Sequence, residues 1–121
     1  MSQMKAVQIS APGRDFELVK RDIPEPSEGQ VRIKVIACGV CHGDAVVIEG
    51  ASFANIEYPR IPGHEVIGLI DKLGPNVSGY AKGQRVGVGW PAGITYDGGY
   101  AEYMVTSEKE LVLIPDELND I

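Results

Sequence analysis

The sequence predicts a mainly β domain, a partly open barrel of short strands with one or two short helices. Three observations favour this class. Short apolar or alternating segments recur along the chain, 15 Gly and 8 Pro separate them without a period, and very little of the chain has a helical pattern. About seven short strands with such punctuation are typical of all-β barrels. The 121 residues suit one domain, which we place at residues 1–121.

Each expected strand is bounded by turn-forming residues. Residues 31–35 alternate between apolar and charged side chains, so one face of this strand should be buried. Residues 65–73 form the longest expected strand, and Gly68 within it indicates a bulge or a close backbone approach. The other strands are expected at residues 5–9, 16–19, 84–88, 100–105 and 111–114.

One short helix is expected in the middle of the chain. Asp44 is suited to cap a helix over residues 45–49, which Gly50 would end. Residues 51–62 contain two prolines and should be irregular, and residues 90–93 should form a tight connection. Residues 116–119 resemble the first turn of a second helix.

Composition narrows the possible partners and the compartment. Acidic residues outnumber basic ones by 17 to 11, and a net charge of −6 repels phosphate backbones and anionic lipids. We therefore expect neither nucleic-acid nor membrane binding. The two cysteines, Cys38 and Cys41, lie too close together to staple a domain, so a disulfide framework is not expected and a reducing, cytoplasmic setting fits best.

Both cysteines and both histidines of the chain fall in two short clusters, residues 38–44 and 63–65. Thiolate and imidazole are the ligands that zinc prefers, with carboxylate next. Three alternatives stay open from the residues alone. A cysteine near a strand end is often a small buried hydrophobe, a histidine is often only a hydrogen-bonded side chain, and a Cys-x-x-Cys pair is sometimes a redox site.

Four ordered motifs carry a family resemblance. They are Gly39-Val-Cys-His-x-Asp44, Pro62-Gly-His-Glu65, Gly83-x-Arg-Val-Gly-Val88 and Asp97-Gly-Gly-Tyr-Ala-Glu-Tyr103. Together they resemble the N-terminal, GroES-like catalytic domain of the zinc-dependent, medium-chain alcohol dehydrogenases, over residues 4–118. The resemblance implies a GroES-like partly open barrel.

The resemblance also implies roles for individual residues. Cys41 and His64 would be ligands of the catalytic zinc, and Glu65 would be an alternative ligand or lie beside the ion. Asp44 would orient a ligating imidazole. His42 would face the pyrophosphate of NAD or NADP, and Cys38 would be a packed thiol. In the parent enzyme, zinc polarises a small alcohol or aldehyde while hydride passes to or from the nicotinamide.

Three departures from the family weaken these expectations. The family's third zinc ligand is a downstream cysteine that this chain lacks, so the zinc site should be weakened. The lobe that holds a structural zinc is replaced by a short turn after Trp90. Gly43 stands where the family has Ser or Thr.

No Gly-x-Gly-x-x-Gly motif lies between a strand and a helix, so we expect the nucleotide-binding domain to be absent. We interpret the chain as an isolated, truncated or engineered catalytic domain that does not transfer hydride alone. The surface facing the missing domain should be apolar, and residues 100–105 and 111–114 should mediate a homodimer or higher oligomer. The alternative function is a self-assembling GroES-like scaffold without catalytic activity.

Overall fold

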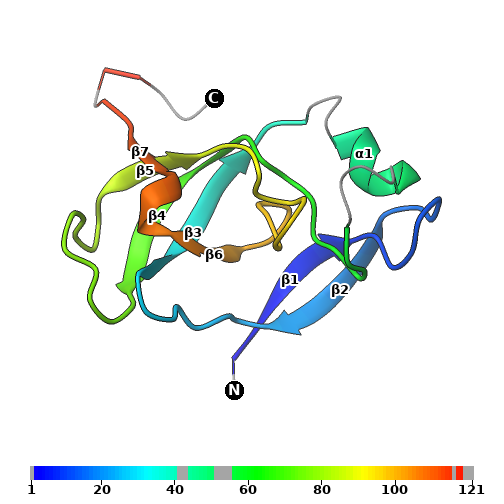
Figure 1. Cartoon of the computed structure of the whole chain (residues 1–121), viewed down its shortest axis with the longest axis horizontal. Helices are drawn as coiled ribbons and strands as arrows, with labels where there is room; N and C mark the ends of the chain where they lie inside the picture. The colour runs from blue at the N-terminus through cyan, green and yellow to red at the C-terminus, as the bar shows by residue number, and fades with distance from the viewer. Residues whose placement is uncertain (1, 41–43, 51–55, 116, 119–121) are drawn as a thin grey trace.

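The computed structural model describes residues 2–40, 44–50, 56–115 and 117–118. Within this part of the chain the structure is mainly β (Figure 1). The elements are β1 (Gln3–Gln8), β2 (Glu17–Asp22), β3 (Gln30–Cys38), α1 (Asp44–Glu49), β4 (Val66–Leu73), β5 (Arg85–Val88), β6 (Tyr103–Ser107), the 3-10 helix η2 (Glu108–Glu110) and β7 (Leu111–Leu113).

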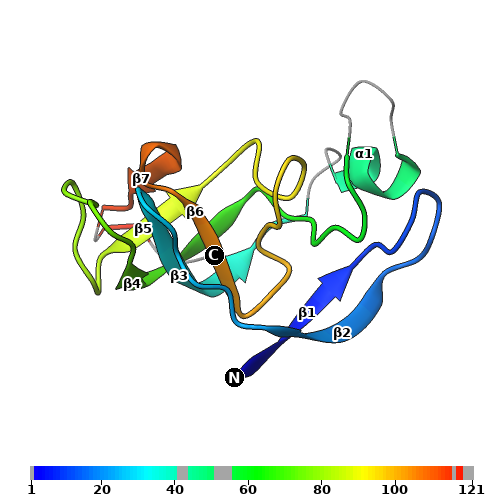
Figure 2. The ribbon, with the colours of Figure 1, turned by 60° about the horizontal axis from the view of Figure 1, so that its bottom comes forward.

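The strands form two antiparallel sheets. β1 and β2 make a hairpin, and the other strands make a five-stranded sheet in the order β6-β3-β4-β5-β7. The larger sheet curls into part of a barrel, with the hairpin beside it (Figures 1 and 2). α1 lies near the turn of the hairpin, away from β7 (Figures 1 and 2), and the amide of Gly13 in that turn donates to the carbonyl of Ile48, 2.6 Å away. The predicted partly open barrel is confirmed.

The inner face of the larger sheet carries the main core. Val31 and Ile33 of β3 are fully buried while Lys34 is exposed, as their alternation predicts. The other buried members come from the remaining strands of this sheet and the loop after β5. They are Val66, Ile70, Val86, Val88, Ala92, Met104 and Leu111. Burial of this apolar surface supplies the main stabilisation of the fold.

Gly68 lies where β3 and β4 come unusually close. A Cβ built on it would lie 2.4 Å from Cγ2 of Ile33 and 2.5 Å from the carbonyl oxygen of Lys34. The register of β3 against β4 shifts between Val35 and Ala37, next to the pairing of Val35 with Gly68. The predicted close approach and irregularity are therefore both present, and only glycine fits there.

The connection from β5 to β6 is compact. Gly93 donates to the carbonyl of Tyr96 over 2.8 Å, and Ala92 donates to that of Gly89 over 3.1 Å. Asp97 then accepts hydrogen bonds from Arg21, Arg60 and the amide of Ile61. The tight connection predicted at residues 90–93 is confirmed. Just after it, Asp97 connects the loop to β2 and to the segment before β4.

Some predicted boundaries were wrong. The strand expected at residues 100–105 begins only at Tyr103, because residues 98–100 pair with residues 61–63 instead. Asp44 is the first residue of α1 and does not precede it, whereas the helix ends before Gly50 as predicted. η2 had no sequence prediction, and Ser107 caps it by accepting from the amide of Lys109. Residues 51–55 and part of 116–119 lie outside the described residues.

β6 and β7 are the two edges of the larger sheet. On β7 the side chains of Val112 and Leu113 are 64% and 52% exposed. No helix among the described residues has the length and apolar character needed to cross a bilayer.

Candidate functional site

His64 lies just before β4. It directly follows residues 61–63, whose backbone is hydrogen-bonded to residues 98–100. The amide of Gly99 donates to the carbonyl of Gly63 over 3.2 Å, and the amide of Tyr100 donates to that of Pro62 over 3.0 Å. Gly63 has a φ of +111°, which side-chain-bearing residues rarely adopt. The Pro62-Gly63 pair therefore gives His64 a fixed backbone position beside the sheet.

The His64 ring is buried between two carboxylates. His64 is only 9% exposed and Asp44 only 3%. Nδ1 of His64 lies 3.4 Å from Oδ1 of Asp44, and its Nε2 lies 3.9 Å from Oε2 of Glu65. Nδ1 is fully buried and has no well-aligned hydrogen bond among the described residues. The ring thus presents Nδ1 to Asp44 and Nε2 to the partly exposed side of the site.

Tyr100 contacts the same carboxylate from the other side. Its hydroxyl donates to Oδ2 of Asp44 over 2.7 Å. Burial raises the pKa of Tyr100 well above its ordinary value. The hydrogen bond to Asp44 and the negative charge of Asp44 raise it further. The phenol therefore keeps its proton and remains the donor. Asp44 accordingly lies between a phenol and an imidazole.

Cys38 is a half-buried thiol at the end of β3. Burial is the main cause that raises its pKa to about 11, and the nearby charges of Asp44 and Glu65 raise it further. At neutral pH the sulfur therefore carries its proton and is a poor metal ligand or nucleophile. This agrees with the expectation of a packed thiol and disfavours the redox-pair alternative.

An open cavity of about 610 Å³ adjoins this site. His64, Glu65 and Cys38 line it at one end, and Val88, Val112 and Ile114 give it apolar walls. Trp90 is 54% exposed, and its ring stands edge-on to the His64 ring with centroids 5.4 Å apart. A small organic molecule in this cavity would meet mainly apolar surface, with the imidazole and carboxylate as its polar end.

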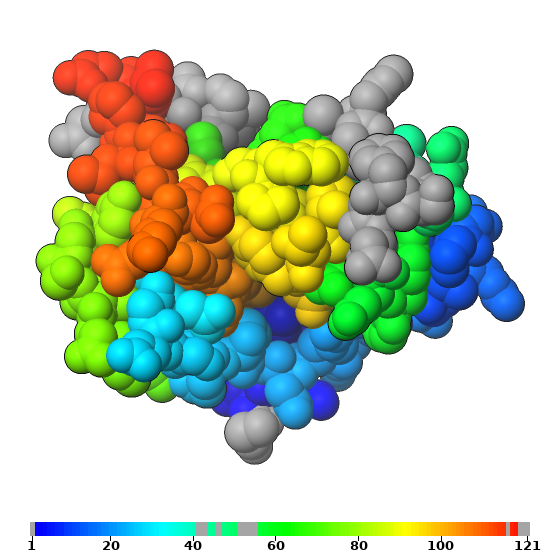
Figure 3. Space-filling model, viewed as in Figure 1, coloured from blue at the N-terminus to red at the C-terminus, as the bar shows by residue number. Residues whose placement is uncertain are grey.

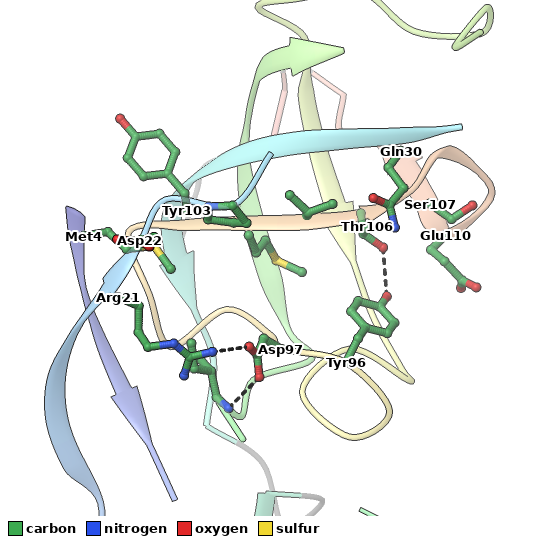
Figure 4. Close-up of a pocket in the computed structure, with 14 residues that line it drawn as sticks. Met4, Arg21, Asp22, Gln30, Tyr96, Asp97, Tyr103, Thr106, Ser107 and Glu110 are labelled. Carbon is green, nitrogen blue, oxygen red and sulfur yellow. Dashed lines mark hydrogen bonds and ion pairs between the residues drawn. The ribbon is translucent and has the colours of Figure 1, made fainter. Parts of the chain in front are cut away.

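A second cavity, of about 400 Å³, lies between the β1–β2 hairpin and β6 (Figures 3 and 4). In Figure 3 the 89–99 loop, in yellow, stands beside this hollow. Figure 4 shows that some of its polar groups bond to one another: Asp97 to Arg21, and the Tyr96 hydroxyl to that of Thr106, 2.8 Å away. None of the described residues that line it is Cys or His, so we place the candidate site at His64.

The structure brings together three of the predicted site residues, His64, Glu65 and Asp44. Cys41, His42 and Gly43 lie outside the described residues, so the expected ligand pair of Cys41 and His64 is not tested. Among the described residues, no three Cys, His, Asp or Glu side chains form a group able to hold a metal ion.

Two residues beside the site were missed by sequence reasoning. Tyr100 was read only as strand and Trp90 only as part of a turn, yet they contact Asp44 and His64. The available signal was their position next to Gly or Pro, in loops that flank the two clusters, since loops on a rigid sheet often carry functional side chains.

Comparisons with known proteins show the family of this chain. Residues 27–116 match the family model described as the alcohol dehydrogenase GroES-like domain. An alcohol dehydrogenase of Geobacillus stearothermophilus is 32% identical over 139 residues, covering 96% of this chain and 41% of the relative. That alignment is longer than the 121-residue chain, so the relative carries extra residues within the matched region.

Two solved structures share the fold at similar identity. An alcohol dehydrogenase (RspB) of Escherichia coli CFT073, in complex with NADH, is 32% identical with a TM-score of 0.83, covering 99% of this chain and 41% of that one. A thermostable alcohol dehydrogenase of Pyrobaculum aerophilum with bound cobalt and zinc is 32% identical with a TM-score of 0.81, covering 93% and 41%.

This chain spans about two fifths of the length of these relatives. The family model covers most of the sequence, and the folds agree over nearly its whole length. The chain therefore belongs to the alcohol dehydrogenase GroES-like domain family.

Proposed function

We propose that this chain is the metal-binding domain of a zinc-dependent alcohol dehydrogenase, with Cys41, His64 and Glu65 as the metal ligands. One observation carries the proposal: the buried His64 ring faces Asp44 with Nδ1 and leaves Nε2 toward the Glu65 carboxylate. A histidine that binds a metal commonly presents its other ring nitrogen to a carboxylate, which fixes the tautomer and orientation of the ring.

The donor set fits zinc. An imidazole nitrogen and a carboxylate oxygen 3.9 Å apart are close enough for one ion to contact both, at the roughly 2.0–2.2 Å typical of zinc ligands. Cys41 would add the thiolate. The relative from Pyrobaculum aerophilum binds cobalt and zinc, which supports a site of this kind. Because one ligand would be the half-exposed Glu65, we expect weaker zinc binding than at a site completed by a second cysteine.

A zinc ion held there would supply a Lewis acid for a small alcohol or aldehyde. The chain's own residues would do the rest. Asp44 would hold the His64 ring, Trp90 would form a wall beside it, and Val88 and Ile114 would keep water from the apolar end of the cavity. A reducing compartment such as the cytoplasm is part of the proposal, because Cys41 must be a free thiolate to bind metal.

Hydride transfer would need a nicotinamide cofactor, NAD or NADP. The chain matches about two fifths of each relative, and most of the cofactor contacts would come from regions outside the matched part. The Escherichia coli relative was solved with NADH. His42 would contribute to this cofactor site. We therefore expect no reduction of NAD or NADP by the 121-residue chain with zinc and an alcohol, as followed by absorbance of the reduced cofactor.

Metal binding is the direct test. Anaerobic Co²⁺ titration of the chain should give the visible absorption of a low-symmetry site with a thiolate ligand, and Zn²⁺ should displace it. Cys41→Ala and His64→Ala should abolish this spectrum. Cys38→Ala and His42→Ala are matched controls that remove the other thiol and the other imidazole, and both should bind as the unaltered chain does. Binding that survives His64→Ala would contradict the assignment.

A GroES-like self-assembling scaffold is the second candidate, favoured by the exposed apolar side chains on the β7 edge. A chain that binds no Co²⁺ but forms discrete, concentration-independent particles by sedimentation would support this candidate over the first.

A further inference from the structure

Asp44 connects two groups that are distant in sequence. One carboxylate oxygen, Oδ2, accepts the Tyr100 hydroxyl at 2.7 Å, and the other, Oδ1, lies 3.4 Å from Nδ1 of His64. The phenol and the imidazole thus contact different oxygens of one carboxylate. The contact with the imidazole is a close approach and not an aligned hydrogen bond, since Nδ1 of His64 has none among the described residues.

Tyr100 belongs to the same rigid segment as His64, whereas Asp44 does not. Residues 98–100 are hydrogen-bonded to residues 61–63, directly before His64. The amide of Val7 also donates to the Tyr100 carbonyl over 2.8 Å, and the Phe16 ring packs on the Tyr100 ring at 5.8 Å. Asp44 instead begins α1. The Tyr100 hydroxyl thus connects the start of this helix to the segment that carries the histidine.

We propose that Tyr100 is a positioning residue of the metal site. Through Asp44 it holds the His64 ring with Nδ1 protonated, so that the lone pair of Nε2 faces Glu65 and the cavity. The metal-binding consequence rests on the proposed function, but the effect on the ring does not require a metal.

Tyr100→Phe removes only the hydroxyl. Tyr58→Phe is the matched control, because the Tyr58 hydroxyl also bonds to α1, but at the Val47 carbonyl. If Tyr100 merely anchored the helix, both variants would behave alike. If it positions the ring, only Tyr100→Phe will change the state of His64.

The first measurement uses the metal-free chain. Long-range ¹H–¹⁵N NMR at about pH 8 reports the tautomer of each histidine, and His42→Ala identifies the His64 signals. We expect the Nδ1-protonated tautomer in the unaltered chain and in Tyr58→Phe, and a mixture of tautomers in Tyr100→Phe. An unchanged His64 tautomer in Tyr100→Phe, or equal changes in both variants, overturns the inference.

Asp44→Asn gives a second route if Tyr100→Phe folds poorly. With its carbonyl oxygen held by Tyr100, the amide would present its NH₂ group to the ring, so the Nε2-protonated tautomer should predominate. Retention of the original tautomer in Asp44→Asn would also refute the positioning role.

The second measurement is the dissociation constant for Co²⁺. Tyr100→Phe should weaken binding about tenfold, since partners outside the ligand shell commonly change metal affinity by that amount or more. Tyr58→Phe should leave it unchanged. If the unaltered chain binds no Co²⁺, the proposed function fails, while the NMR result still decides the role of Tyr100.

Discussion

The sulfur of Cys38 fills the space where a side chain on Gly63 would have to lie. A Cβ built on Gly63 would be 2.8 Å from Sγ of Cys38, and 2.9 Å from both the Gly99 amide nitrogen and the Tyr100 ring. The residue before His64 must therefore be glycine for steric reasons as well as for its φ of +111°. Packing of a thiol thus helps to define where the candidate ligand lies.

Gly63→Ala should destabilise the chain by about 2–6 kcal/mol, because backbone strain and overpacking each cost roughly 1–3 kcal/mol. Urea unfolding followed by circular dichroism measures the change. Gly13→Ala is the control: Gly13 also has a positive φ, of +78°, but nothing lies within 4 Å of its built Cβ. Equal losses in the two variants would show that packing against Cys38 is unimportant.

Cys38 should react slowly with thiol reagents. With a pKa of about 11, only about a thousandth of this thiol is ionised at pH 8, against about a quarter for an ordinary thiol. In Cys41→Ala, where Cys38 is the remaining cysteine, alkylation by iodoacetamide at pH 8 should be about 250-fold slower than in the same variant unfolded in urea. Comparable rates would show that the sulfur is not desolvated.

The same raised pKa predicts how stability depends on pH. The folded chain keeps the Cys38 proton that the unfolded chain loses near the ordinary thiol pKa. Below that pKa the thiol therefore makes its full contribution to the free energy of unfolding. This contribution is then lost as the pH rises toward about 11. The stability of the unaltered chain should therefore fall relative to that of Cys38→Ala over this alkaline range. Parallel pH profiles from urea unfolding would contradict this.

Asp97→Ala should cost about 2–3 kcal/mol. Asp97 accepts from Arg60, whose side chain is only 10% exposed, and its loss would leave that buried guanidinium without its carboxylate. This expected loss of stability is below the usual cost of breaking a fully buried ion pair, because the Asp97 side chain is 37% exposed. Glu25→Ala removes an exposed partner of Lys72 and Arg32, and Arg32 keeps its ion pair with Asp71, so this control should change the urea midpoint little. A similar small effect of Asp97→Ala would argue against the bridging role.

Self-association should depend on β7. Val112→Lys places a charge on an edge strand, where it should oppose pairing with a second chain and shift a dimer or larger oligomer toward monomer. Sedimentation velocity over a range of concentrations measures this. Leu18→Lys, at a residue 72% exposed on β2, is the control and should leave the oligomeric state unchanged. A monomeric unaltered chain would disprove the expected oligomer.

The strands that could be predicted were those with a strong local pattern. Residues 31–35 alternate, and β3 buries Val31 and Ile33 accordingly. Residues 100–102 have the composition of a strand but lie before β6, because the amide of Tyr100 bonds to the Pro62 carbonyl and that of Glu102 to the Lys5 carbonyl. Such partners are distant along the chain, so no local pattern could have indicated them.

The candidate site was also predicted only in part. Imidazole and carboxylate chemistry singled out His64, Glu65 and Asp44, and these side chains do lie together. Tyr100 and Trp90 carry no metal-binding chemistry of their own and gain their importance only from contacts with Asp44 and His64. The role of Cys41 remains a prediction.

The sequence by itself determined the β-rich class, the family, and the residue types able to bind a metal, because periodicity, turn residues and donor chemistry are local properties of the chain. Only the tertiary structure decided that Asp44 lies between Tyr100 and His64, that Cys38 packs into the space beside Gly63, and that β6 and β7 form the edges of the sheet. These relationships depend on which distant segments pair, and strand pairing is fixed by the packing of the whole core.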